Sequence, residues 1–294
     1  MPMTPHPLQL TRRSWIAGLT GLILSACRPV TLLNAVIPDK GMHVHRNIAF
    51  GPHRRQRLDI YQPRDQASTP HPVVVFFYGG SWDSGSKQDY LFVAEALTSQ
   101  GMLVVIADYR LYPEVKFPQL MQDPALAVQW VREHAADYHG DASRLFLMGH
   151  SAGAHLAVML SLNPVYLAAA GLSPAVIKGT VGLAGPYDFL PLTSETLRAI
   201  FAPPDQEWQS QPIRFVRGQH PPLLLLAGLK DRTVWPRNSI NLAQALEAQG
   251  SEVTLLTYPN YDHVDMVAKL ARPLRGNSPL LQDICGWMAQ HASA

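Results

Sequence analysis

Cysteine is scarce in this chain, and the residues that bind zinc are dispersed. The 294 residues include two cysteines, Cys27 and Cys285, and twelve histidines. If Cys27 carries a lipid, as argued below, Cys285 has no partner and a disulfide is excluded. The histidines lie along the whole chain without the short-spaced His/Glu or Cys pairs of zinc sites. We therefore expect no metal site.

Charge is limited as well. The formal net charge is +2 and charged residues make up 16%, with Lys and Arg scattered, so a nucleic-acid partner is not expected. Hydrophobic residues make up 47%, enough for a sizeable core. A chain of this length is predicted to form one large domain, with room for a small insertion. Nothing in this composition indicates an oligomeric state.

A long apolar run is missing at the N-terminus. The apolar segment 15–24 spans about ten residues, whereas a transmembrane helix needs roughly 20. Two basic residues, Arg12 and Arg13, precede it, and the small residues Ser25 and Ala26 follow it. This order is typical of a secretory signal peptide. Residues 11–16 also resemble a twin-arginine export signal, which leaves the export route open.

The end of this segment resembles a bacterial lipobox. Leu24-Ser25-Ala26 leads directly into Cys27, the position at which lipoproteins are cleaved and acylated. We predict a lipoprotein-type signal peptide over residues 1–27, a lipid on Cys27, and a tether over residues 28–47. The protein would then be exported and anchored to a bacterial membrane, facing the periplasm or the cell exterior. The alternative is a plain signal peptide with a coincidental cysteine.

Residues 48–294 alternate short apolar segments with longer helical patterns. Segments that are apolar on both sides are typical of parallel strands covered by helices on both faces. Strands are predicted at 72–78, 103–107, 145–148, 181–184, 223–227 and 253–258. Helices are predicted at 90–100, 121–139, 152–162, 239–249 and 280–291. This alternation predicts an α/β domain with a mostly parallel, doubly wound sheet, and residues 54–61 could add an antiparallel hairpin.

Residues 189–221 break the alternation. They contain no clear strand and are rich in proline, glutamine and aromatic residues. Because structureless loops of this length are uncommon in compact domains, we predict a small cap insertion over the sheet edge. A long surface connection with one or two helices is the alternative.

The sequence Gly149-His150-Ser151-Ala152-Gly153 carries the strongest chemical signal. It follows a predicted strand and precedes a predicted helix, the context in which G-x-S-x-G places a nucleophilic serine on a tight turn. We predict Ser151 as the nucleophile. The backbone N–H of Ala152, directly after it, is a predicted donor to an oxyanion.

A serine nucleophile needs a base and an acid, which in this fold follow later in the chain on loops after strands. Asp231 follows the strand at 223–227, and His263 follows the strand at 253–258. These two residues are the predicted acid and base. Asp188 and Asp205 are weaker candidates for the acid.

A glycine pair at Gly79-Gly80, followed by Ser81 and Trp82, lies after the strand at 72–78. Glycines let a backbone approach a substrate carbonyl closely, so this loop is predicted to supply further oxyanion donors.

With these motifs, the chain resembles the esterase/lipase group of α/β-hydrolases, which includes hormone-sensitive-lipase-like, feruloyl-esterase-like and kynurenine-formamidase-like proteins. The match rests on residues 79–82, 108–114, the Ser151 turn and the Asp231/His263 pair, and it covers about residues 73–264. The resemblance implies the α/β-hydrolase fold, with neither metal nor organic cofactor. It also implies that residues 108–114 brace the active-site loops.

The first loop departs from the family pattern, because Tyr78 stands where the group usually has histidine. By the same match, Gly80 and Ser81 would be the oxyanion donors, Gly79 would allow the turn, and Trp82 would line the substrate pocket. The expected activity is hydrolysis of small-molecule carboxylic esters through a Ser-Asp-His triad and an acyl-enzyme. An aryl formamidase or amidase with the same triad is the first alternative, and a non-catalytic binding lipoprotein is the remote one.

Overall fold

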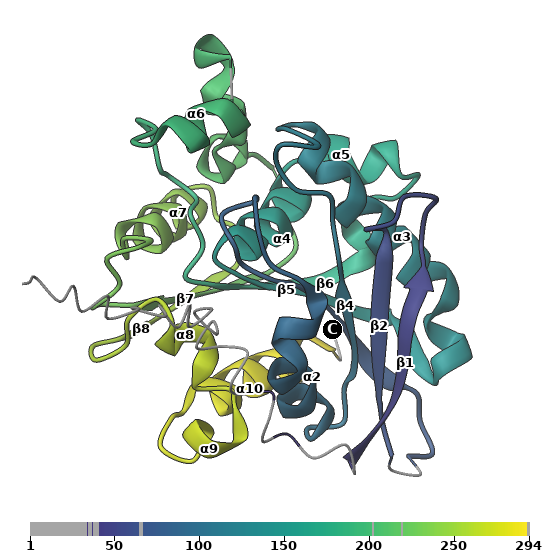
Figure 1. Cartoon of the computed structure of the whole chain (residues 1–294). Coiled ribbons are helices and arrows are strands. Elements are labelled where there is room, and N and C mark those ends of the chain that lie inside the picture. The colour runs from purple at the N-terminus through teal and green to yellow at the C-terminus, as the bar shows by residue number, and fades with distance from the viewer. Residues whose placement is uncertain are drawn as a thin grey trace, which may run out of the picture.

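A computed structural model of the protein describes residues 34, 37, 41–64, 67–201, 203–218 and 220–292. Within them, eight strands form one sheet in the order β1-β2-β4-β3-β5-β6-β7-β8 (Figure 1). The two antiparallel pairings are β1 with β2 and β2 with β4, and all other pairings are parallel. The strands are β1 (Met42–Ala49), β2 (Arg57–Pro63), β3 (His71–Phe77), β4 (Leu103–Ala107), β5 (Gly140–His150), β6 (Ile177–Leu183), β7 (Leu223–Gly228) and β8 (Val253–Tyr258).

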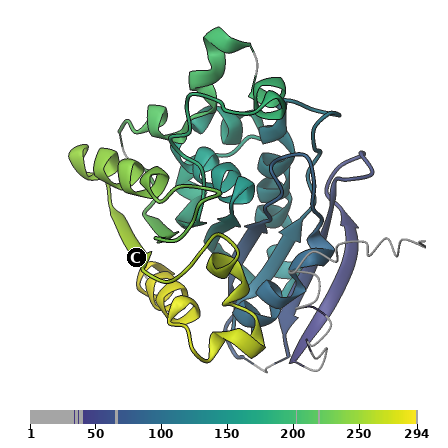
Figure 2. The same ribbon diagram turned by 60° about the vertical axis from the view of Figure 1, so that its left-hand side comes forward.

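Helices cover both faces of this sheet (Figure 2). The α-helices are α2 (Leu91–Thr98), α3 (Gln122–His134), α4 (Ala152–Leu162), α5 (Pro164–Ala169), α6 (Glu195–Phe201), α7 (Arg237–Ala248), α8 (Asp265–Ala268), α9 (Arg272–Arg275) and α10 (Leu280–Ala292). Short 3-10 helices are η2 (Lys87–Tyr90), η3 (Gln119–Met121), η4 (Ala135–Tyr138), η5 (Pro174–Val176), η6 (Pro204–Ser210) and η7 (Pro212–Phe215). The predicted α/β-hydrolase fold is confirmed, and so are its six predicted strands and five predicted helices, with ends that shift by a few residues.

The central strands are apolar on both faces because both faces are covered. In β7, Leu223 and Leu225 pack with α4 and α7, whereas Leu224 and Leu226 belong to the main core. All four side chains are fully buried. Burying a leucine side chain contributes about 1.5–3 kcal/mol to folding. The continuous apolar runs in the sequence are therefore the expected signature of this double cover.

The N-terminal boundary of the domain differs from the prediction. Residues 42–47, which we assigned to the tether, form the first part of β1, and Met42 is buried against α2, where it accepts a hydrogen bond from the Thr98 hydroxyl. The hairpin predicted at 54–61 accordingly spans β1 and β2. As an edge strand β1 is only half covered, and its sequence His43-Val44-His45-Arg46 lacks the apolar run by which buried strands are recognised.

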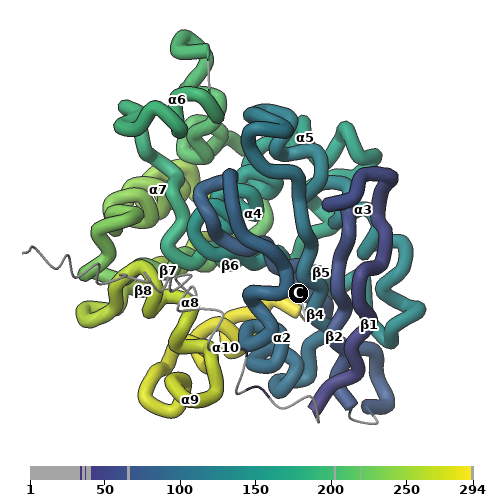
Figure 3. Tube along the Cα trace, viewed as in Figure 1, coloured from purple at the N-terminus to yellow at the C-terminus, as the bar shows by residue number. Residues whose placement is uncertain are grey.

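The carboxyl ends of β3 and β5–β8 meet at one edge of the sheet, where the loops that follow them gather. In Figure 3 the green segment that carries α6 lies beyond this edge, at the top of the view. The described part of residues 189–221 forms α6, η6 and η7 and contains no strand. Its function as a cap stays a prediction, although side chains from it line the cavity described below.

Candidate active site

Ser151 occupies a sharp turn between β5 and α4. Its φ and ψ angles are 55° and −123°, a backbone conformation that is costly for a residue with a side chain. The Ser151 N–H donates to the Leu183 carbonyl of the neighbouring strand over 2.9 Å, which holds the turn against the sheet. The hydroxyl is thereby lifted above the strand ends, as the motif predicts.

The glycines on either side of this turn are required by close backbone contacts. A Cβ on Gly149 would lie 2.3 Å from the Gly153 carbonyl oxygen, and a Cβ on Gly153 would lie 2.0 Å from the Phe77 carbonyl oxygen. Both distances are far below van der Waals contact, so no side chain fits at either position. The spacing of the motif follows from this packing of α4 against the end of β3.

The three predicted residues Ser151, His263 and Asp231 form a chain of hydrogen bonds. The Ser151 Oγ lies 3.0 Å from Nε2 of His263, and Nδ1 of His263 lies 2.7 Å from Oδ2 of Asp231. Because a carboxylate only accepts, Nδ1 carries the proton, and Nε2 is left to accept the serine proton. The arrangement is that of a nucleophile, a base and an orienting acid.

Asp231 is held independently of the histidine. Its side chain is 1% exposed, and its Oδ1 accepts hydrogen bonds from the backbone N–H groups of Thr233 and Val234, each over 2.8 Å. The other acidic residues have different partners. Asp188 accepts from Asn241, and Asp262 Oδ1 accepts from the N–H groups of Val264 and Asp265 in its own turn.

His150 makes a contact that the sequence did not indicate. Its Nε2 lies 3.0 Å from the carbonyl oxygen of His263, so Nε2 is the protonated nitrogen and donates. The two rings lie 4.8 Å apart between centroids. Burial, and then the charge of His263, lower the pKa of His150 to about 3, so it stays neutral and fixes the loop that carries His263. No local signal identifies this contact, because the two residues are 113 positions apart.

The three backbone N–H groups predicted as oxyanion donors have no backbone acceptor among the described residues. The N–H of Ala152, the first residue of α4, has no acceptor within its helix. In the loop after β3, neither Gly80 nor Ser81 donates a backbone hydrogen bond to any described residue. Gly80 has a φ of 134°, and a Cβ there would lie 2.2 Å from the Ser84 carbonyl oxygen. A Cβ on Gly79 would lie 3.0 Å from the Ser151 Cβ, so this loop runs directly beside the serine.

Tyr78, the departure from the family pattern, belongs to a buried polar network beneath this loop. Its hydroxyl donates to Oδ1 of Asp108 over 2.8 Å and accepts from Nη2 of Arg55 over 2.7 Å. Its ring stacks on Tyr109, whose hydroxyl donates to the Tyr78 carbonyl over 2.7 Å. Arg55 also donates to the Gly85 carbonyl at the end of the loop. Burial raises the pKa of Tyr78, so the residue acts as a neutral brace.

Ser151 opens into a cavity of about 350 Å³. Trp82 lines it, is 4% exposed, and packs against Phe189 and Phe201 from the predicted cap at ring-centroid distances of 6.0 and 4.8 Å. Gly79 does not line the cavity, although a Cβ at this position would meet the Cβ of Ser151. The lining residues are Ser81, Trp82, Ser151, Pro186, Phe189, Pro191, Thr193, Leu197, Arg232, Thr233, Val234, Trp235, Arg237 and Asn238.

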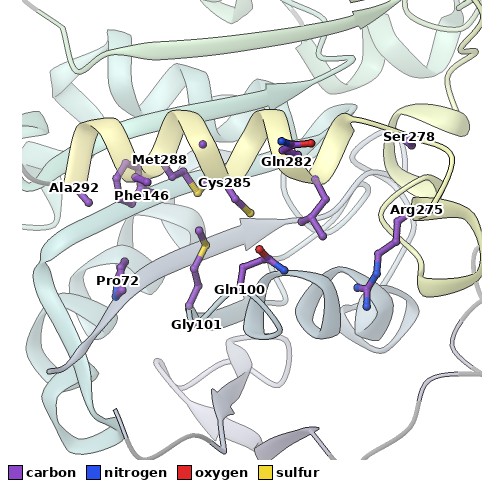
Figure 4. Close-up of a pocket in the computed structure, with 15 residues that line it drawn as sticks. Pro72, Gln100, Gly101, Phe146, Arg275, Ser278, Gln282, Cys285, Met288 and Ala292 are labelled. Carbon is purple, nitrogen blue, oxygen red and sulfur yellow. The ribbon is translucent and has the colours of Figure 1, made fainter. Parts of the chain in front are cut away.

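A larger cavity of about 680 Å³ lies elsewhere, between α10 and the end of α2 (Figure 4). None of the predicted site residues lines it. Arg275 at its rim is paired with Glu95 over 2.9 Å. Cys285 is half-buried in its wall, and burial raises the pKa of the thiol to about 12. A thiol that stays protonated is a poor nucleophile, so we place the chemistry at Ser151.

Among the described residues, no helix has the length and apolar character needed to cross a bilayer. In the same part of the chain, no three His, Cys, Asp or Glu side chains are grouped as metal ligands. Cys27 and the predicted signal peptide lie outside the described residues. Their lipidation and export functions stay predictions.

Two buried histidines make stability depend on pH. Burial lowers the pKa of His150 to about 3 and of His155 to about 4, below the ordinary 6.5. Since the unfolded chain takes up these protons near pH 6.5 and the folded chain does not, the free energy of unfolding should fall as pH drops below 6.5. At pH 5 the loss should reach about 4 kcal/mol for the two together.

Urea unfolding at pH 8 and pH 5 measures this loss. A His155→Gln variant removes one of the two groups and should show about half the difference. Equal stability of the unmodified protein at the two pH values would contradict the prediction.

Comparison with known proteins places these features in a family. The BD-FAE family model matches residues 58–246. A probable isoprenylcysteine alpha-carbonyl methylesterase of Arabidopsis thaliana is 28% identical over 265 residues, which cover 82% of this chain and 55% of the plant protein. The chain thus spans about half the length of that relative. Kynurenine formamidase of Salmo salar is 29% identical over 231 residues, 76% of each chain.

Solved structures show the same fold. Esterase B from Lactobacillus rhamnosis superposes with a TM-score of 0.78 at 19% identity and covers 90% of this chain and 91% of its own. A truncated carbohydrate esterase from gut microbiota has a TM-score of 0.76 at 20% identity, covering 88% of this chain and 99% of its own. With a family model that matches more than half of its residues, the chain belongs to the BD-FAE family and has the α/β-hydrolase fold of esterases.

Proposed function

We propose that this protein hydrolyses carboxylic esters with Ser151 as the nucleophile. The observation that carries the proposal is the hydrogen-bonded chain from Ser151 through His263 to Asp231, with unpaired backbone N–H groups beside the serine. At the level of the family, the similarity to proteins named as esterases supports the same reaction class.

The proposed reaction uses this geometry. His263 Nε2 takes the hydroxyl proton as Ser151 Oγ bonds to the ester carbonyl carbon, and Asp231 stabilises the resulting imidazolium. The negative charge on the carbonyl oxygen is held by the N–H groups of Gly80, Ser81 and Ala152. His263 then gives its proton to the departing alcohol as the C–O bond breaks. Water, deprotonated by His263, attacks the acyl-enzyme and releases the acid and the free serine.

The size of the cavity supports a small substrate. Its volume of about 350 Å³ is near the lower end of the range of about 300–1,000 Å³ for small-molecule sites. Trp82 and Phe189 close one side of it. The proposal therefore includes short acyl or alcohol groups rather than long alkyl chains.

A formamidase is the second candidate, because a kynurenine formamidase is among the relatives. The same nucleophile, base and oxyanion donors cleave an activated amide, and the geometry contains no feature against it. The two candidates differ only in the leaving group that His263 protonates.

The two candidates are separated by comparing kcat/KM for a series of p-nitrophenyl esters, from acetate to palmitate, with kcat/KM for an aryl formamide. We expect the highest kcat/KM at acetate to butyrate and at least about tenfold lower kcat/KM for the formamide, since an amine is the poorer leaving group. Labelling with a fluorophosphonate checks that the serine is reactive. Faster turnover of the formamide would favour the second candidate, and an unlabelled, inactive but folded protein would contradict both.

A further inference from the structure

We propose that the cavity beside Ser151 contains a subsite for a negatively charged group, formed by Arg232 and Arg237. The substrate would be an ester that carries a second, anionic group, such as a carboxylate, within reach of these two guanidinium groups. This inference rests on the proposed function, because it names the class of ester that the same site accepts.

The charge of the cavity wall is the first observation. Both arginines line the cavity that holds Ser151, and none of its lining residues is Asp or Glu. Neither arginine forms an ion pair or a side-chain hydrogen bond with any described residue. The wall therefore carries two uncompensated positive charges.

Other arginines of the domain are used differently. Arg55 reaches Asp108, Arg110 is bound to Asp123 over 2.8 Å, and Arg275 is bound to Glu95 over 2.9 Å. Each of these pairs joins separate parts of the chain. Arg232 and Arg237 make no such connection, and both residues are exposed, so their guanidinium groups can reach a ligand in the cavity.

The position of Arg237 adds to the argument. It is the first residue of α7, a helix of 12 residues, where the helix dipole is positive. A cation there is unfavourable, and a bound anion is favourable. The charge of Arg237 therefore adds to the positive electrostatic potential at the N-terminus of α7.

The loop that carries Arg232 is held rigidly by the catalytic acid. Asp231 Oδ1 accepts from the N–H groups of Thr233 and Val234, so hydrogen bonds join the backbone that follows Arg232 to the side chain that contacts His263. The Asp231 carboxylate is buried, is hydrogen-bonded to His263 and does not line the cavity. An anion bound to the arginines thus meets no opposing carboxylate from the cavity wall.

A carboxylate is the group that this wall fits best. A guanidinium presents parallel N–H donors that match the two oxygens of a carboxylate, and such charge-assisted hydrogen bonds are about twice as strong as neutral ones. Trp235, which lines the same wall and is 56% exposed, offers an apolar surface for the carbon chain that bears the anion.

Two matched pairs of esters test the subsite. Monomethyl adipate and methyl hexanoate place the charge, or its absence, on the acid side, and 4-acetoxybenzoate and 4-acetoxybenzamide place it on the alcohol side. The measured quantity is the ratio of kcat/KM for the charged ester to that for the neutral ester. We expect a ratio of about ten or more in at least one pair, since hydrogen bonds to charged groups are stronger than those between neutral groups. The preferred pair shows on which side of the ester the anion lies.

The variants Arg232→Gln and Arg237→Gln should each lower this ratio about threefold, and the double variant should bring it to about one, which abolishes the preference. Arg217→Gln makes the same charge change outside the cavity and should leave the ratio within twofold. Because an ion pair at a partly exposed site is screened, raising NaCl from 0.05 to 0.5 M should also lower the ratio.

The outcomes separate this inference from the function it rests on. Equal kcat/KM for charged and neutral esters, with turnover abolished by Ser151→Ala, would overturn the subsite and leave the esterase intact. A preference that survives in the double arginine variant would overturn the subsite as well. Absence of turnover for all four esters, from folded protein, would overturn both.

Discussion

Replacing Ser151 by alanine is expected to lower kcat for short acyl esters about 10⁵- to 10⁶-fold, the scale at which removal of a serine nucleophile acts in such sites. The hydroxyl is the atom that bonds to the substrate, and no other hydroxyl in the described structure lies within hydrogen-bond distance of His263. The rate that remains would come from the oxyanion donors and from substrate binding. Steady-state hydrolysis of p-nitrophenyl acetate measures the loss.

The fold should tolerate this change. Ser151 holds its unusual backbone conformation through its N–H bond to Leu183, which alanine also makes. Ser173→Ala is a matched control at the surface, where the Ser173 side chain caps η5. The variant should keep kcat within about twofold, because it removes only the capping hydrogen bond to the Ala175 N–H. Turnover near that of the unmodified enzyme by a purified, folded Ser151→Ala protein would refute Ser151 as the nucleophile.

Asp231→Asn should lower kcat about 10⁴-fold with little change in structure. The Asp231 Oδ1 accepts two backbone N–H bonds, so the asparagine carbonyl oxygen must take that position. Its NH₂ group then faces Nδ1 of His263 and donates to it, which moves the ring proton to Nε2. Nε2 can no longer accept the proton of Ser151, so the base is lost although every heavy atom stays in place.

Asp262→Asn is the matched control for this variant. Asp262 precedes His263 in sequence, but its carboxylate accepts from Val264 and Asp265 and not from the histidine. It should change kcat less than about tenfold, because it affects a surface turn. The pH dependence of kcat/KM for both variants identifies the base. If Asp262→Asn were the more damaging of the two, the acid would have to be reassigned.

The main residues of the candidate site could be predicted because each lies in a recognisable local context. Ser151 was recognisable because a strand, a tight glycine turn and a helix follow one another within a few residues, so the packing limits at Gly149 and Gly153 appear directly in the sequence. Asp231 and His263 were recognisable because loops after parallel strands meet at one edge of the sheet. The distances of 2.7 Å between His263 and Asp231 and of 3.0 Å between His263 and Ser151 agree with the order in which these residues follow one another in the sequence.

Other features depend on contacts between distant segments. The hydrogen bond from His150 to the His263 carbonyl, and the network that holds Tyr78, join residues 30 or more positions apart that carry no local pattern. The edge strand β1 was assigned to the tether because half-covered strands lack an apolar run. The charge of the cavity wall was equally hidden, since Arg232 and Arg237 are surface residues in any local reading.

The sequence by itself determined the fold class and singled out Ser151, Asp231 and His263 as the candidate site residues, because these follow from short-range backbone geometry and from the alternation of apolar strands and helices. The tertiary structure alone decided where β1 begins, how Tyr78 braces the loop after β3 and which side chains share the cavity with Ser151. Those properties arise from the packing of segments that are far apart in the chain, and the pattern of any one segment does not contain them.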